Sequence, residues 1–194
     1  MTPEQVVAEI SRRAWSFGVA VIVSPNDHVM ADGLRASGYF DGEADQPVLA
    51  CSTGGPPDKW LGTLLHEYSH LTQWAEKCPL WDQAGGDWDD WIGGKSVRNV
   101  KAQLIGSREL EADCERRTIR LIREMGAPVD LERYTRAANA YVHFYNTIAA
   151  TRKWYAKGKE PYNNAEVLAL ANPTLDRDFS KTPAKLAKAL LGCV

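Results

Sequence analysis

The spacing of apolar residues predicts a helix followed by short strands in the first part of the chain. Apolar positions three and four residues apart predict a helix over 3–17, with Thr2 as its cap and Gly18 as its stop. Its inward stripe comprises Val6, Val7, Ile10, Ala14 and Phe17. Short apolar runs then predict three strands, at 19–23, 37–41 and 48–52. The first is apolar enough to be buried on both faces.

The spacing of apolar residues predicts longer helices over the rest of the chain. The first begins at Pro56-Pro57-Asp58 and ends before Pro79, with a core-facing stripe of Trp60, Leu61, Leu64, Leu65, Tyr68, Leu71, Trp74 and Ala75. Further helices are predicted over 107–125, 130–156, 165–171 and 183–191, the last with Thr182 as its cap and Pro183 in its first turn. The pattern therefore indicates an α+β protein: a small N-terminal sheet packed on two helices, followed by a mostly helical C-terminal part.

Length and composition limit the classes of protein that fit. The 194 residues suit a core over 1–126 with a helical extension over 127–194, together one domain. A formal net charge of −2 gives no broad attraction to nucleic acid or membrane. No apolar run is long enough to cross a bilayer, and residues 1–24 lack the regions of a signal peptide, so we expect a cytoplasmic protein. The four cysteines form no C-x-x-C motif, and we expect them to be reduced and mostly buried.

One motif on the 56–78 helix carries chemistry. His66, Glu67 and His70 form the pattern H-E-x-x-H. Two imidazoles four residues apart lie one turn apart on one helix face, where both can reach a single metal ion. Glu67 can then act as a base towards metal-bound water. The alternative is an ordinary amphipathic helix with two surface histidines, but the apolar flanks favour a buried site whose imidazoles need partners.

A third ligand is expected from the helix over 107–125. Glu109 and Asp113 are four residues apart and share a face, so one carboxylate could bind the metal while the other orients a ligating histidine. Glu111 is the alternative ligand, which requires a different rotation of this helix. Arg108, Glu111, Glu115 and Arg116 have the pattern of a solvated face.

These two motifs resemble those of zincin metallopeptidases of the gluzincin kind. The order H-E-x-x-H followed by a downstream E-x-x-A-D is also similar to small ImmA/IrrE-type bacterial and phage zincins, which often carry Asn where this chain has Asp113. The resemblance covers about residues 1–126. It implies Zn²⁺ held by His66, His70 and Glu109, Glu67 as general base, and Asp113 as a partner of a ligating histidine. It also implies an extended substrate added to a sheet edge, for which 48–52 is the expected strand.

The remaining histidines and aromatic residues give weaker signals. A metzincin is disfavoured because no third histidine follows the motif, and His28 and His143 have the pattern of ordinary histidines. Tyr141, His143 and Tyr145 are candidates for stabilising an oxyanion, although an aromatic stripe at helical spacing more often forms core. Tryptophans and aspartates alternate over 81–94, which predicts either a mobile wall over the site or a loop whose tryptophans pack while its aspartates face water.

The sequence thus predicts a zinc-dependent metallopeptidase acting on a peptide or protein, without a nucleic-acid or membrane partner. The alternative is a zincin-fold regulatory or binding protein with one specific partner and little general proteolysis. The intact Glu67 favours the enzyme, since a binding module needs no base there. The sequence predicts neither the cleavage specificity nor the oligomeric state.

Overall fold

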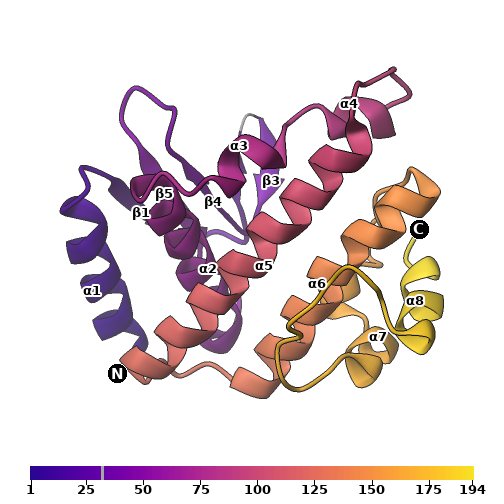
Figure 1. Cartoon of the computed structure of the whole chain (residues 1–194). Helices are drawn as coiled ribbons and strands as arrows, with labels where there is room; N and C mark the ends of the chain where they lie inside the picture. Colours follow the sequence, from indigo (N-terminus) through magenta and orange to yellow (C-terminus); the bar gives the residue numbers. More distant parts are fainter. Residues whose placement is uncertain (32) are drawn as a thin grey trace. The chain divides into compact units, whose positions relative to one another are not determined.

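The computed structural model describes residues 1–31 and 33–194 as an α+β protein (Figure 1). The elements are α1 (Pro3–Trp15), β1 (Ala20–Ser24), β2 (Val29–Ala31), β3 (Leu34–Ala36), β4 (Gly38–Asp41), β5 (Val48–Ser52), α2 (Pro57–Ala75), α3 (Leu80–Ala84), α4 (Trp88–Ile92), α5 (Val100–Met125), α6 (Leu131–Thr151), a 3-10 turn (Pro161–Asn163), α7 (Ala165–Leu170) and α8 (Ala184–Leu191). The α+β class and the small N-terminal sheet expected from the sequence are confirmed.

The chain divides into two compact units. Unit 1 comprises Met1–Cys78 and Cys114–Leu131, and unit 2 comprises Pro79–Asp113 and Glu132–Val194. This division differs from the expected boundary at residue 126, because α5 contributes its first half to unit 2 and its second half to unit 1.

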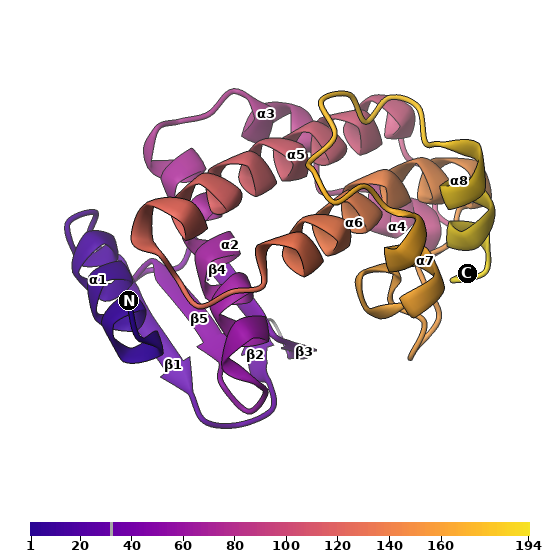
Figure 2. The same cartoon turned by 90° about the horizontal axis from the view of Figure 1, so that it is seen from below.

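Unit 1 contains a three-stranded sheet in the order β1-β5-β4, visible in Figure 2. The central strand β5 runs parallel to β1, with Ala20 opposite Val48, and antiparallel to β4, with Gly38 opposite Cys51. The expectation that 48–52 is the edge strand is therefore wrong. Within the described part of the chain, β1 and β4 are the outer strands of this sheet. A separate antiparallel pair, β2 and β3, was not expected from the sequence.

The outer position of β1 explains a second difference from expectation. This strand is not buried on both faces, since Ile22 is 50% exposed and Val23 is 37% exposed. The central strand β5 is the buried one, with Leu49, Ala50 and Cys51 at most 2% exposed. Apolar composition alone does not distinguish these two positions in a sheet.

Helices α1 and α2 pack against each other, α1 also contacting β1 and α2 contacting β4 and β5. The expected cap of α1 is confirmed: the Thr2 hydroxyl accepts from the Gln5 backbone amide, and the Gln5 side chain accepts from the Thr2 amide in return. The expected inward position of Phe17 is wrong, since the helix ends at Trp15 and Phe17 is 47% exposed.

Polar contacts fasten the second half of α5 to α2 within unit 1. The Thr118 hydroxyl donates to Ser69 Oγ at 2.9 Å, and the Arg117 guanidinium donates to Thr72 Oγ1 at 3.2 Å and to Glu76 at 2.8 Å. Because Thr118 and Ser69 are both buried, this contact fixes the rotation of α5 about its axis. That rotation decides which α5 side chains face the motif histidines.

Unit 2 has its core where α6, α7 and α8 meet. Buried members of this core are Leu104, Ala140, Phe144, Tyr145, Ile148, Val167, Ala171, Leu186, Leu190 and Cys193. Helix α6 ends at Thr151, earlier than expected, and Arg152 follows with φ of 58°. Helix α8 takes Pro183 as its N-cap, and the Thr182 hydroxyl expected to cap it is bonded elsewhere.

The stretch 81–94 forms the short helices α3 and α4. The Trp88 ring packs near Tyr145 and Trp154 and donates to Ser107, and the Trp91 ring lies under the Arg152 guanidinium. The four aspartates are exposed: Asp82, Asp87, Asp89 and Asp90. Trp88, Trp91 and the solvated aspartates fit the second of the two sequence interpretations, whereas Trp81 is 38% exposed and does not. None of the helices described is long and apolar enough to span a membrane.

Candidate metal centre

The two motif histidines face each other on one side of α2. Their ring centroids are 4.7 Å apart with planes at 86°, and His66 Nε2 lies 3.2 Å from His70 Nε2. Both side chains are half-buried, as is Glu67. Two nitrogens bound to one tetrahedral zinc at ~2.0–2.1 Å would be about 3.3 Å apart. The Nε2 separation therefore fits a shared zinc ion.

The other nitrogen of each ring has a partner of its own. His70 Nδ1 lies 2.9 Å from Gln73 Oε1, and His66 Nδ1 lies 3.2 Å from Glu115 Oε1. Each of these oxygens can accept the Nδ1 proton, and a neutral imidazole protonated at Nδ1 has its lone pair at Nε2. Both lone pairs then point into the same space. Metal-ligating histidines are held in this way in proteins.

The Cys114 side chain lies close to both motif histidines. Its Sγ is 3.5 Å from His66 Nδ1 and 3.3 Å from the His66 carbonyl oxygen. Among the described residues, His66, His70 and Cys114 are the group that could hold a metal ion, with ligand atoms within 4.8 Å of one another. Cys114 is therefore a candidate third ligand, next to Glu115 on α5.

The electrostatic environment of His66 suits a cation. Burial alone would lower the pKa of this imidazole, but Cys114 and Glu115 outweigh burial and raise the pKa well above its ordinary value. Glu115 is only 4% exposed, and Arg108 is 7% exposed. The expectation that Arg108 and Glu115 belong to a solvated face is therefore wrong.

Glu67 lies beside the outer strand β4. A Cβ added at Gly38 would lie 3.2 Å from Glu67 Cγ and 2.7 Å from the Thr63 methyl group, so glycine permits α2 to approach this strand closely. The Glu67 charge also adds to burial in raising the pKa of Cys51 to about 12. The base of the motif thus sits at the edge of the sheet.

Of the three acidic residues expected near the metal, Glu109 pairs with Arg108, whereas Glu111 and Asp113 are half-buried. Both Nε and an Nη of Arg108 donate to Glu109 Oε1, and a further Arg108 nitrogen donates to Asn146 Oδ1 at 2.8 Å. Glu111 is half-buried, with a buried carboxylate oxygen. Asp113 is half-buried and precedes Cys114 by one residue.

The three oxyanion candidates on α6 do not lie together: Tyr141 and Tyr145 are neighbours, and His143 lies elsewhere on the helix. Tyr141 and Tyr145 have hydroxyls 3.4 Å apart, and burial followed by the charge of Glu111 raises the pKa of both far above the ordinary value. Both hydroxyls therefore stay protonated and near Glu111. His143 is fully buried on another face of α6, where it bonds to Asp176 and Thr182, away from the two tyrosines. His28 is half-buried and belongs to no metal-binding group among the described residues.

Sequence reasoning missed Gln73, Cys114 and Glu115 as neighbours of the motif histidines. Gln73 follows His70 by three residues, a spacing that places both side chains on one helix face, and it is fully buried. Glu115 follows Glu111 by four residues, the same spacing that had drawn attention to Glu109 and Asp113. The four cysteines are free and mostly buried, as expected.

We compared the chain with models of protein families, with curated proteins and with solved structures, and found no match in any of the three comparisons.

Proposed function

We propose that this protein is a zinc-dependent metallopeptidase. The observation that carries the proposal is the pair of Nε2 atoms 3.2 Å apart, each on a ring whose Nδ1 faces an oxygen acceptor. A metal ion between the two Nε2 atoms would take the place of the proton that a hydrogen bond between them requires. The donor set of two imidazoles with buried oxygen partners is typical of zinc sites.

The third ligand follows from the rotation of α5. Cys114 and Glu115 both face His66, and an α-helix turns by about 100° per residue. Glu111 then lies within about 60° of both positions, whereas Glu109 lies about 120° or more from each. Helix geometry therefore favours Glu111 as the ligand over Glu109, which the motif resemblance predicts. By the same reasoning Glu115 replaces Asp113 as the residue that orients His66.

Zinc held by these residues would lower the pKa of its water to ~7 and polarise a substrate carbonyl. Glu67 accepts a proton from the attacking water and passes it to the leaving amine. The free edge of β4, next to Glu67, offers backbone groups to an extended peptide.

The test combines metal analysis with digestion of a peptide library. Protein purified without added zinc is expected to contain about one zinc per chain. Glu67→Gln should retain zinc and lose hydrolysis, whereas His66→Ala should lose zinc. Full hydrolysis by Glu67→Gln refutes the mechanism, and zinc without hydrolysis in the wild type supports a regulatory or binding protein on the same scaffold.

A matched pair of variants tests the third ligand. Glu111→Gln should weaken zinc binding strongly, while Glu109→Gln, two residues away on the same helix, should leave it nearly unchanged. The opposite ranking would restore Glu109 as the ligand. Equal weak effects would exclude both carboxylates and leave Cys114 as the remaining protein donor.

A further inference from the structure

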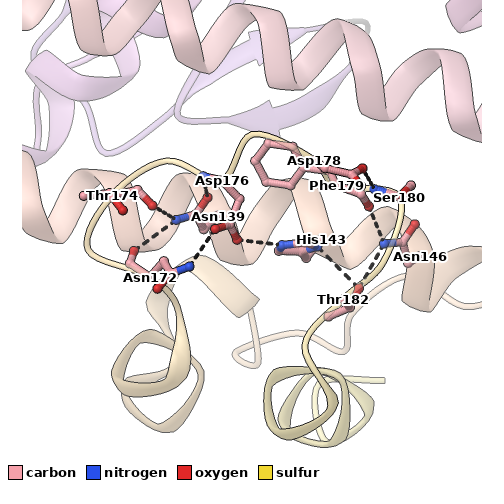
Figure 3. Close-up of polar contacts among 10 residues, drawn as sticks. All are labelled: Asn139, His143, Asn146, Asn172, Thr174, Asp176, Asp178, Phe179, Ser180 and Thr182. Carbon is pink, nitrogen blue, oxygen red and sulfur yellow. Dashed lines mark hydrogen bonds and ion pairs between the residues drawn. The ribbon is translucent and has the colours of Figure 1, made fainter.

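Residues 172–182, here called the strap, cross unit 2 without forming a helix or strand. Three side chains of α6 at successive turns hold it: Asn139, His143 and Asn146 (Figure 3). Asn139 Nδ2 donates to the carbonyls of Asn172 and Thr174, and its Oδ1 accepts from the amide of Asp176. Asn146 Nδ2 donates to the Phe179 carbonyl at 2.8 Å and to the Thr182 hydroxyl at 2.9 Å.

His143 occupies the middle of this network and is fully buried. Its Nε2 lies 2.9 Å from Asp176 Oδ2, its Nδ1 lies 3.4 Å from Thr182 Oγ1, and its ring lies 4.8 Å from the ring of Phe179. Both ring nitrogens are therefore used by strap residues. The protonation state of His143 decides whether both contacts can be made together.

The directions of the hydrogen bonds follow from Arg108. A guanidinium only donates, so the Asn146 atom that faces Arg108 is its Oδ1, and Asn146 Nδ2 must face the strap. Thr182 Oγ1 accepts from that Nδ2 with one of its two lone pairs, and its own proton is free to be donated to His143 Nδ1. This arrangement suits a neutral His143 with its proton on Nε2 directed to Asp176.

A second proton on His143 would conflict with this arrangement. It would add to Nδ1, so the Thr182 hydroxyl would have to turn its own proton away and accept from the ring as well as from Asn146, and a charge would be placed in a fully buried network. Asp176 and Asp178 of the strap favour the charged ring, while burial and the Arg108 guanidinium of α5 oppose it. Burial is the largest of these effects, and the net result is a lowered pKa of His143.

We propose that this network is an acid-sensitive latch, in which protonation of His143 displaces the Thr182 hydroxyl and frees the strap from α6. Release would uncover Phe179, which is 1% exposed and packs with Val142 and with Ala112 of α5. Ala112 adjoins Glu111, so the latch reaches the turn of α5 that carries the proposed metal ligand. The proposal itself does not depend on a bound metal.

Hydrogen exchange of the peptide 172–182, measured by mass spectrometry on the full chain and corrected for intrinsic rates, tests the latch. Between about pH 7.5 and about pH 4.8, protection of this peptide should fall by up to about tenfold per pH unit once the pH drops below the ordinary histidine pKa of ~6.5. In His143→Gln, which cannot be protonated, protection should not depend on pH. His28→Gln, with another histidine removed, should behave as the wild type.

A second variant keeps the test decisive if His143→Gln does not fold. Asp176→Asn retains an acceptor for Nε2 but removes the carboxylate that favours the charged ring in the closed strap, so the acid loss of protection should begin at the same pH and be larger than in the wild type. A strap whose protection does not change with pH in the wild type overturns the proposal. So does an acid loss of protection in Asp176→Asn that is no larger than that of the wild type, or an acid response in His143→Gln equal to that of the wild type.

Discussion

Replacing Glu115 by Gln should weaken zinc binding without unfolding the protein. Glu115 is 4% exposed, and its Oε1 lies 3.2 Å from His66 Nδ1, so in the proposed zinc site it would hold the ring orientation that directs Nε2 to the metal. Gln has nearly the same size and can still accept the Nδ1 proton. The substitution therefore removes the charge from this hydrogen bond while leaving the packing in place.

The expected size of the effect follows from the loss of that charge. A hydrogen bond to a charged group contributes about 1.5–3 kcal/mol and a neutral one about 0.5–1.5 kcal/mol, a difference of about 1–1.5 kcal/mol. Since about 1.4 kcal/mol corresponds to a tenfold change, zinc affinity should fall about tenfold. Glu115→Ala leaves Nδ1 without its carboxylate acceptor, and affinity should fall by up to about a hundredfold.

Competition with a chromophoric chelator at fixed pH measures these affinities. Glu124→Gln, an exposed position on the same helix, is the control and should bind zinc as the wild type does. Circular dichroism would establish that each variant is folded. An orienting carboxylate should change zinc affinity about tenfold. If the zinc affinity of Glu115→Gln lies within about twofold of the wild-type value, the assignment of His66 as a ligand oriented by Glu115 is refuted.

Four further predictions concern close packing and one buried thiol. Gly38→Ala would place a methyl group against Glu67 and Thr63, and it should lower kcat by about tenfold to a hundredfold with the zinc content unchanged. Gly55→Ala, where the added methyl group meets open space, should have no effect. An unchanged kcat in Gly38→Ala would contradict the close approach of α2 to β4. Gly106→Ala would place a methyl group against the Gln83 backbone carbonyl and should lower the free energy of unfolding by about 1–3 kcal/mol in urea denaturation. Gly86→Ala, where the methyl group meets open space, is the control, and an equal loss of stability in both variants would argue against the predicted clash. Cys51, with its pKa raised to about 12 by burial and by Glu67, should resist iodoacetamide at about pH 8 while half-buried Cys78 reacts. Because unfolded thiols titrate near pH ~8.5, the raised pKa of Cys51 should also make the free energy of unfolding fall by about 1.4 kcal/mol per pH unit above that value. The slope of Cys51→Ala should be smaller than that of the wild type by this amount, and equal slopes would refute Cys51 as the source.

The sequence predicted well the features that depend on neighbours along the chain. The cap at Thr2, the existence of the main helices and the proximity of His66 and His70 all follow from spacings of three or four residues. Features that depend on distant neighbours were predicted poorly. An apolar run does not reveal whether its strand is central, as β5 is, or outer, as β1 is.

The rotation of α5 shows the same limit at the candidate site. Two pairs of acidic residues on this helix have the same spacing, Glu109 with Asp113 and Glu111 with Glu115. Glu115 faces His66 of α2, and its position is set by contacts such as Thr118 with Ser69, which join residues 49 positions apart. The polar face that looked solvated in the sequence contains Arg108 and Glu115, which are buried because each has a charged or polar partner at another helix.

Helix α5 has a consequence for how this molecule loses its structure on heating. The same continuous stretch of hydrogen-bonded backbone belongs to both compact units, so melting it removes part of each hydrophobic core at once. Neither unit can therefore be excised at a loop to give an intact fragment, and two separate calorimetric peaks, common for proteins whose domains meet at a flexible linker, are not expected here.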